Sequence, residues 1–254
     1  MSFLQAILLG LVQGITEFFP ISSSAHLKLA KWFLHIPDGE HLLYFDLLLH
    51  SGTLLALLIY LRKDVLEILR DVHKIALYFV ALAPLIPAYF FLKPLRIWAS
   101  NPAFLGYALL ISSALLFGAS KKKSCPAHAQ KGNKWKNVLC IGMMQTMALI
   151  PGISRSGSTI SAARYCGWTW SEAARFSFLL AIPTILGGEL LETLKGHPAG
   201  GVSFACYLGG FIASLALGLI SVRFIFWVYG QGKVRPFAWY CLILGIFSWV
   251  LFNG

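Results

Sequence analysis

Apolar stretches separated by short polar segments dominate the chain. Six of these stretches approach or reach the roughly 17–25 residues that a helix needs to cross the hydrocarbon of a bilayer. They cover residues 43–61, 75–92, 103–119, 176–194, 202–222 and 237–252. The pattern predicts six membrane-spanning helices.

Two further apolar segments, 10–34 and 142–164, are interrupted by proline, serine and a charged residue. Backbone that departs from a helix is tolerated at membrane depth only where it is buried in protein or lines a wet cavity. We therefore interpret each segment as a re-entrant helical hairpin, which enters the membrane and returns to the same side. The predicted fold class is an all-α integral membrane protein.

Composition supports this class. Hydrophobic residues make up 57% of the chain, charged residues 12%, and the mean hydropathy is +0.71. These values exclude an ordinary soluble domain, in which about a quarter of the residues are charged, and they exclude disorder. The net charge of +11 would suggest nucleic-acid binding in a soluble protein, but here it indicates cytoplasmic loops near anionic lipid.

The Lys and Arg content of the loops predicts the orientation. Loop 62–74 holds four of these residues and loop 121–136 holds six, whereas loop 192–201 holds only Lys195. By the positive-inside rule, the basic loops lie in the cytoplasm. This orientation is consistent with six spans, three in each half of the chain.

The two interrupted segments repeat each other at a constant offset of 132 residues. The matched residues are a glycine, a glutamine and two serines: Gly10, Gln13, Ser22 and Ser24 in the first segment, and Gly142, Gln145, Ser154 and Ser156 in the second. Each copy contains one hairpin and three spans, and this odd number of crossings inverts the second copy relative to the first. We predict one membrane domain over residues 1–254, with repeats of about 1–120 and about 137–254 joined by the cytoplasmic loop 121–136.

Such an inversion brings the two interrupted segments together near the middle of the membrane. The residues expected to face one another across one cavity are Glu17, Ser23 and His26 on one side and Ser154, Arg155 and Ser156 on the other.

The second segment reads P-G-I-S-R-S-G-S-T at 151–159. Its glycines let backbone N–H groups approach a ligand, and its hydroxyls add hydrogen-bond donors. Arg155 offers a planar fork that matches two phosphate oxygens. A stretch of small residues that packs helices explains the glycines and serines, but it does not explain an arginine inside the membrane. The motif therefore predicts a phosphate site.

The first segment combines Gln13, Glu17 and His26 with a serine run at 22–24. Gln13 and Glu17 share one helix face, and Pro20 breaks the helix. Glu17 can act as a base or a metal ligand, and His26 can transfer a proton or orient a nucleophile. The serines can cap the next helix, bind phosphate or attack it.

Other titratable residues have weaker interpretations. Asp46 and His50 lie four residues apart in one span and are expected to pair with each other. Glu189 and Glu192 are expected near the membrane interface. A single carboxylate is too few for an all-protein metal cage, but Mg²⁺ often takes one or two carboxylates together with substrate phosphates. Glu17 is therefore a candidate ligand for a substrate-bridged divalent ion.

At these two motifs the chain resembles the undecaprenyl-diphosphatase family, the bacitracin-resistance phosphatases of bacterial inner membranes. The segment from Gln13 to His26 is similar to the family's (E/Q)-x-x-x-E segment, which runs into a proline, a serine-rich stretch and a histidine. Residues 151–159 match the family's P-G-x-S-R-S-x-x-T segment, and Gly142 and Gln145 supply the preceding G-x-x-Q.

The resemblance implies removal of the terminal phosphate from undecaprenyl diphosphate, for recycling of the cell-wall lipid carrier. It also implies a multi-pass protein of the bacterial inner membrane, a site that opens to the periplasm, and dependence on a divalent metal such as Mg²⁺ or Ca²⁺. The catalytic candidates are Glu17, Ser23, His26 and Arg155, with Glu17 also as the metal ligand. The substrate-binding candidates are Gln13, Ser22, Ser24, Ser154, Ser156 and Thr159. Expected partners are the polyprenyl diphosphate, membrane lipids and a second copy in a homodimer, with no nucleic acid.

Two other function classes compete with this one. A transporter or flippase of a polyprenyl phosphate is the alternative, because inverted repeats and broken helices at the midplane are typical of transporters. An anion channel is disfavoured, because Arg155 lies beside nucleophile-like groups. Release of phosphate by purified protein in detergent distinguishes an enzyme from a transporter, since no membrane separates two compartments there.

Overall fold

The computed structural model describes residues 1–37, 39, 42–122, 134–196 and 201–254, and the regular elements within these ranges are all helices. In chain order the α-helices are α1 (Phe3–Thr16), α2 (Ser23–Phe33), α3 (Leu43–Tyr60), α4 (Arg62–Leu69), α5 (Val72–Leu82), α6 (Leu85–Phe91), α7 (Lys93–Ala99), α8 (Leu105–Ser120), α9 (Lys134–Gln145), α10 (Arg155–Tyr165), α11 (Trp170–Leu194), α12 (Phe204–Gly230) and α13 (Arg235–Asn253). Short 3₁₀ turns, η2 (Pro102–Phe104) and η4 (Thr146–Leu149), precede α8 and follow α9. The all-α fold class is confirmed.

Six helical segments of the described chain are long and apolar enough to cross a membrane: Leu43–Tyr60, Val72–Phe91, Pro102–Ser120, Trp170–Leu194, Phe204–Gly230 and Arg235–Asn253. Each overlaps one predicted span, so the chain is a multi-pass membrane protein. The predicted span 75–92 is divided, because α5 ends at Leu82 and α6 begins at Leu85. Pro84 lies between them and has no N–H to continue the helical hydrogen bonds.

Two long helices extend beyond their predicted spans. α11 begins at Trp170 because Thr169 and Glu172 form a capping box, in which each side chain accepts the other residue's backbone N–H. α12 continues to Gly230, past the predicted end at residue 222.

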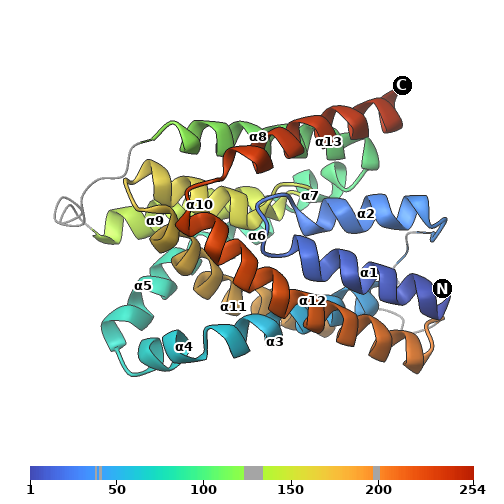
Figure 1. The fold of residues 1–254 in the computed structure, drawn as a ribbon, viewed down its shortest axis with the longest axis horizontal. Coiled ribbons are helices and arrows are strands. Elements are labelled where there is room, and N and C mark those ends of the chain that lie inside the picture. The colour runs from blue at the N-terminus through green and yellow to red at the C-terminus, as the bar shows by residue number, and fades with distance from the viewer. Residues whose placement is uncertain (38, 40–41, 123–133, 197–200) are drawn as a thin grey trace.

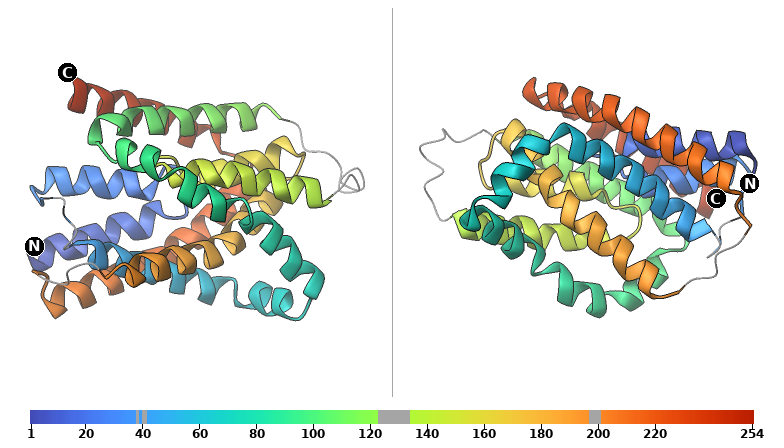
Figure 2. Two further views of the ribbon diagram at one scale, coloured as in Figure 1. Left: turned by 180° about the vertical axis from the view of Figure 1, so that it is seen from behind. Right: turned by 90° about the horizontal axis from the view of Figure 1, so that it is seen from below.

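Both interrupted segments are hairpins of two helices with a break between them, and whether they are re-entrant stays a prediction. They begin earlier than predicted, at Phe3 and Lys134. Each break ends at a serine that caps the following helix: the Ser22 Oγ accepts the N–H of Ala25, and the Ser154 Oγ accepts the N–H of Gly157. The α1–α2 and α9–α10 hairpins enter the bundle from opposite ends, so their breaks lie near its middle (Figures 1 and 2). An inverted relation between the complete halves stays a prediction.

Small residues hold these hairpins against the spans. A Cβ atom added to Gly10 of α1 would lie 2.4 Å from the carbonyl oxygen of Gly210 in α12. A Cβ atom added to Gly142 of α9 would lie 2.3 Å from the carbonyl oxygen of Ala81 in α5. Close backbone approach at glycine is a common way for helices to associate in a bilayer. The tight contacts fix where each hairpin break lies in the bundle.

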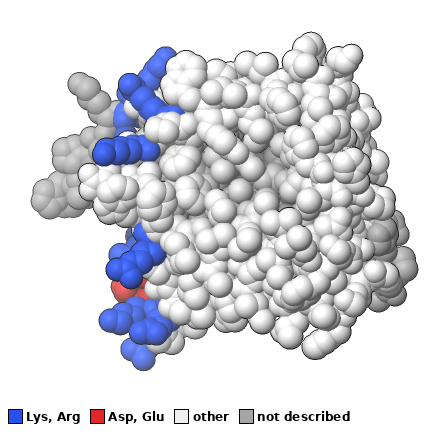
Figure 3. Space-filling model, turned by 45° about the vertical axis from the view of Figure 1, so that its right-hand side comes forward, with Lys and Arg blue, Asp and Glu red and all other residues white. Residues whose placement is uncertain are grey.

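Lys and Arg side chains gather at one end of the molecule (Figure 3). The exposed basic residues of α4 and of the start of α9 belong to this end, which is the left-hand end in Figure 1. The chain termini lie at the opposite end (Figure 1). The basic residues therefore gather at one end of the axis along which the spans run, as the positive-inside rule predicts for a membrane protein.

Candidate active site

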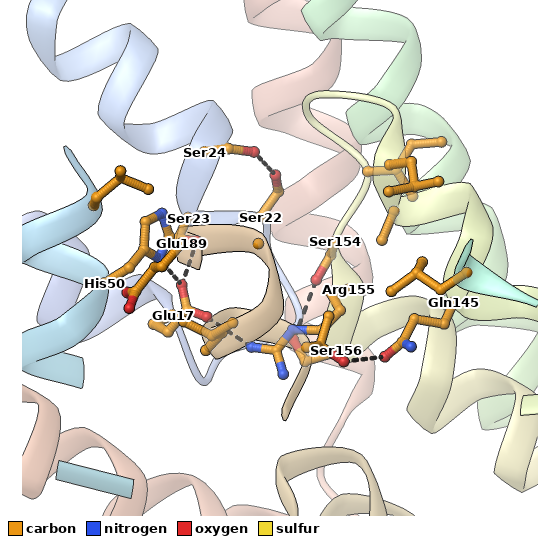
Figure 4. Close-up of a pocket in the computed structure, with 18 of the residues that line it drawn as sticks. Glu17, Ser22, Ser23, Ser24, His50, Gln145, Ser154, Arg155, Ser156 and Glu189 are labelled. Atoms are coloured by element: carbon orange, nitrogen blue, oxygen red, sulfur yellow. Dashed lines mark hydrogen bonds and ion pairs between the residues drawn. The ribbon is translucent and has the colours of Figure 1, made fainter. Parts of the chain in front are cut away.

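A cavity of about 330 Å³ lies where the two hairpin breaks meet. Both hairpins contribute to its wall, and α3, the start of α6 and the second half of α11 complete it. The polar residues that line it are Glu17, Ser22, Ser23, Ser24, His50, Gln145, Ser154, Arg155, Ser156, Thr184, Glu189 and Glu192. Figure 4 shows that side chains from both hairpins point toward one another here.

An ion pair joins the two hairpins across the cavity. Nη2 of Arg155 lies 2.6 Å from Oε1 of Glu17, and these side chains are only 14% and 5% exposed. Arg155 begins α10, and Glu17 directly follows α1. Each charge compensates the other, because a buried charge is stable only when it is paired. The structure thus brings together the two residues that the repeat placed opposite each other.

The second carboxylate oxygen of Glu17 organises a hydroxyl and an amide. Oε2 accepts hydrogen bonds from Oγ of Ser23 at 2.7 Å and from Nε2 of Gln13 at 2.9 Å. Ser23 is the first residue of α2 and lines the cavity. Its hydroxyl is therefore held next to a carboxylate that can accept its proton.

The remaining serines connect the two breaks. Within each hairpin the matched serines lie 3.2 Å apart, Oγ to Oγ: Ser22 with Ser24, and Ser154 with Ser156. The Ser24 Oγ also accepts the N–H of Gly152 from the other hairpin at 3.3 Å. Ser156 donates to the backbone of the first hairpin at 3.1 Å. The hydroxyls thus form a polar wall that belongs to both hairpins.

Two hydrogen-bond donors in this wall have no partner among the described residues. Nη1 of Arg155 and Nε2 of Gln145 are both buried and unbonded. Gln145 is 1% exposed, and its Oε1 accepts from the hydroxyl of Thr184 at 3.4 Å. A buried donor without an acceptor costs about 1–3 kcal/mol. The cavity is therefore suited to a ligand with several anionic oxygens.

His26 does not line the cavity, so the expectation that it faces Arg155 there is wrong. Its Nδ1 lies 2.7 Å from the carbonyl oxygen of Ser22, and its Nε2 lies 2.8 Å from the hydroxyl of Tyr240. The imidazole also stacks on the Tyr240 ring with the centroids 5.6 Å apart. These contacts turn the His26 ring toward α13.

Gln13 and Thr159 are buried behind the wall rather than in it. Gln13 is fully buried and contacts Glu17 and His50 through its amide nitrogen. Thr159 is bonded to the Ser177 hydroxyl at 2.6 Å and to the carbonyl of Arg155 at 2.9 Å. Their side chains support the site residues but do not reach a ligand in the cavity in this arrangement.

His50 is a cavity residue that the sequence interpretation missed. The predicted pair of Asp46 and His50 is wrong, because Asp46 forms an ion pair with Lys31 at 2.6 Å. His50 turns instead toward Glu17, with Nδ1 3.3 Å from Oε2. The signal was present in the sequence, since a titratable residue inside a span indicates function, but spacing along one helix could not identify its partner on another.

Gln145 and Glu189 were also missed as cavity residues. Gln145 is the repeat equivalent of Gln13, so the offset alone could have identified it. Glu189 and Glu192 lie near the end of α11, as expected, but they also line the cavity. Oε1 of Glu189 accepts a hydrogen bond from Ser51 at 3.1 Å.

The arrangement around Glu17 does not fit a metal ligand. Oε1 is bonded to the Arg155 guanidinium, and Oε2 already accepts hydrogen bonds from Ser23 and Gln13. A divalent cation on Glu17 would lie beside a positive charge. No three His, Cys, Asp or Glu residues of the described ranges lie close enough together to hold a metal by themselves. Glu189 fits better, because it lines the same cavity and accepts its hydrogen bond from the neutral hydroxyl of Ser51.

Comparison with known proteins agrees with this site. A family model described as bacitracin resistance protein BacA matches residues 6–247. An undecaprenyl-diphosphatase from Protochlamydia amoebophila is 39% identical over 259 residues, which cover 100% of both chains. Proteins of the same name from Christiangramia forsetii and Methanosphaera stadtmanae are 35% and 34% identical, covering 97% and 98% of this chain and 97% of their own lengths. With a family match that includes both hairpin breaks and relatives that align along the full length, the chain belongs to the BacA family of bacitracin resistance proteins.

Proposed function

We propose that the protein is a membrane phosphatase that converts undecaprenyl diphosphate into undecaprenyl phosphate and inorganic phosphate. The observation that carries this proposal is the pair of unbonded donors, Arg155 Nη1 and Gln145 Nε2, in one cavity with a carboxylate-bound serine. A diphosphate supplies the oxygens that these donors lack. The names of the full-length relatives support the same substrate and reaction.

In this proposal, Ser23 attacks the terminal phosphorus. Glu17 orients the Ser23 hydroxyl at 2.7 Å and accepts its proton. Arg155 binds phosphate oxygens through its free nitrogen, while its other nitrogen keeps Glu17 in place. Phosphoryl transfer depends mostly on positioning and on stabilising the charge of the transferring group. The hydroxyls of both hairpins and the Gln145 amide add donors for the same purpose.

The apolar side of the cavity suits the prenyl chain. Leu85 and Ile185 line the same cavity that we propose for the diphosphate. A second, apolar cavity of about 260 Å³ lies between α4, α5 and α11, lined in part by Leu82, Ile182 and Leu186. We propose that the prenyl chain leaves the site along this side of α11, because an apolar tail gains stability by staying out of water.

A divalent cation, Mg²⁺ or Ca²⁺, is part of the proposal. We assign Glu189 rather than Glu17 as the carboxylate that would hold it, together with substrate phosphate oxygens and water. A bound cation would neutralise charge on the diphosphate during phosphoryl transfer.

We further propose that the protein resides in the bacterial inner membrane, with the cavity accessible from the periplasmic side. The last turns of α11, which contribute Glu189 and Glu192 to the cavity, lie at the end of the bundle opposite the basic end (Figures 1 and 3). We also propose that the protein forms a homodimer. A measurement of the size of the purified protein in detergent tests this.

Phosphate release tests the function. Purified protein in detergent is expected to release phosphate from a long-chain prenyl diphosphate, and a chelator is expected to reduce the rate. Glu189→Gln is expected to raise the Mg²⁺ concentration needed for half-maximal rate by at least about tenfold, because even the loss of a residue that only orients a ligand typically costs about 10- to 100-fold in metal affinity. A folded protein that releases no phosphate in detergent, but moves a polyprenyl phosphate across vesicles, would identify a transporter instead.

A further inference from the structure

The geometry points to His50 as the terminal acceptor of the proton that the Ser23 hydroxyl loses, with Glu17 as the carrier between them. This inference rests on the proposed phosphatase function. It assigns to His50, a residue of α3, a positioning and proton-relay role in which it acts through Glu17.

The three groups form a continuous chain of contacts. Ser23 Oγ lies 2.7 Å from Oε2 of Glu17, and the same oxygen lies 3.3 Å from Nδ1 of His50. The His50 side chain is 27% exposed and lines the cavity (Figure 4). A proton can therefore pass from the serine through one carboxylate oxygen to the imidazole without movement of the backbone.

Gln13 fixes the tautomer of His50. The Gln13 Nε2 lies 2.8 Å from Nδ1 of His50 and 2.9 Å from Oε2 of Glu17. An amide nitrogen only donates, so Nδ1 of the neutral imidazole accepts and its proton sits on Nε2. The opposite orientation of the Gln13 amide would place two acceptor oxygens against each other. The lone pair of Nδ1 therefore accepts the Gln13 N–H beside Oε2 of Glu17, and the Gln13 amide has to turn aside as Nδ1 takes up the proton.

The surrounding charges favour transfer onward from Glu17. A proton that stayed on Glu17 would remove the partner of Arg155, which lies 2.6 Å away. A proton on His50 instead forms an ion pair with Glu17 across the existing 3.3 Å contact. The other charged groups that face His50 are Asp46, which is paired with Lys31, and Glu189 on α11.

The atoms balance over two steps. In the first, an Oγ–P bond forms at Ser23 and the bond from phosphorus to the bridging oxygen breaks, with its electron pair leaving on the lipid monophosphate. The serine proton moves to Glu17 and then to His50. In the second step, water forms a bond to phosphorus and the Oγ–P bond breaks. Ser23 recovers a proton from that water, phosphate keeps the other, and His50 releases its proton to the cavity.

His26 lacks the contacts for this role. Both of its ring nitrogens are engaged, one by the Ser22 carbonyl and the other by the Tyr240 hydroxyl. The two histidines can therefore be distinguished experimentally.

His50→Gln is the informative variant, because a glutamine side chain can accept the hydrogen bond from Gln13 but cannot take up a proton. We expect kcat to fall by about 10²- to 10⁴-fold, the usual contribution of acid–base assistance, with KM within about threefold of the wild-type value. The rate falls at low pH when His50 is already protonated, so the acid limb of log kcat against pH should become less steep by one proton. His73→Gln, an exposed residue of α5, is the matched control and should retain wild-type kcat, KM and acid limb.

A second measurement does not depend on the variant. In ¹⁵N-histidine spectra of the folded wild-type protein, the neutral His50 ring is expected to carry its proton on Nε2. A proton on Nδ1 of the neutral ring would overturn the relay. So would a folded His50→Gln protein whose kcat is unchanged. A variant with an increased KM and an acid limb of log kcat against pH that keeps its wild-type slope would also overturn it. A wild-type protein that releases no phosphate would instead contradict the proposed function itself.

Discussion

Arg155 uses its two terminal nitrogens for different tasks. Nη2 holds Glu17 at 2.6 Å, whereas Nη1 is buried without a hydrogen-bond partner. Lysine offers a compact ammonium group that cannot reproduce this planar fork. Arg155→Lys is therefore expected to lower kcat/KM by at least about 100-fold in a phosphate-release assay, while melting in detergent stays close to wild type. Wild-type turnover in this variant would mean that position 155 supplies charge alone.

Ser23 permits a sharp distinction between a nucleophile and a hydrogen-bond donor. If its oxygen attacks phosphorus, Ser23→Ala should lose more than about 1,000-fold in kcat, because the covalent route is removed. Loss of one hydrogen bond would cost about 1–3 kcal/mol, or roughly one to two decades in rate. Ser24→Ala, one residue further along α2, should show only this smaller loss. Acid quenching of wild-type turnover with labelled substrate should trap phosphoserine at position 23.

Direct attack by water gives the opposing outcome. Oxygen-18 from water enters the released phosphate by either route, because water also hydrolyses a phosphoserine at phosphorus, so the discriminating result is a turnover that releases phosphate and traps no phosphoserine. That result, together with a Ser23→Ala variant that keeps more than about a tenth of the rate, would exclude the serine mechanism.

The sequence predicts site residues best where it carries a repeated pattern. Glu17 and Arg155 could be placed opposite each other, because each follows from a motif and the offset relates the motifs. His50 and Glu189 could not be assigned, because their orientation depends on how α3 and α11 rotate against the hairpins. His26 was misplaced for a similar reason: its partner Tyr240 comes from α13, far away in sequence.

At the scale of elements, the prediction was most accurate in the number of spans and least accurate in their ends. Six apolar runs gave six spans, because the thickness of a bilayer sets their length. The ends depend on local contacts that hydropathy does not measure, such as the Thr169–Glu172 capping box that starts α11 early. The hairpin breaks were predicted because Pro20 and Pro151 interrupt the two segments.

The contact of α1 with α12 yields a stability prediction. Gly10→Ala would place a Cβ atom 2.4 Å from the Gly210 carbonyl oxygen, and such overpacking typically costs about 1–3 kcal/mol. We expect a lower melting temperature in detergent and a lower rate, because α1 positions Glu17. Gly187→Ala is the matched control, since nothing lies within 4 Å of the added atom and alanine favours the helix. Equal melting of both variants would argue against close packing at Gly10.

At the scale of the whole molecule, the two ends of the bundle are expected on opposite sides of the membrane, and cysteine labelling can measure this orientation. In a background without the native cysteines, Lys122→Cys at the end of α8 should react only with reagent on the cytoplasmic side. Lys195→Cys at the end of α11 should react only from outside, because the basic end of the bundle stays in the cytoplasm. Labelling of both positions from the same side would contradict the odd number of crossings and the inverted repeat that depends on it.

The ion pair between Glu17 and Arg155 joins residues 138 positions apart in the chain. During synthesis, α1 to α8 emerge and enter the membrane well before Arg155 exists. A nascent chain at that stage carries the serine and its carboxylate, but it lacks the guanidinium that would hold a phosphate. An unfinished protein therefore lacks half of its phosphate site. The first phosphate released by a newly made molecule reports the docking of its second hairpin, so turnover can serve as a clock for the meeting of the two halves in the membrane.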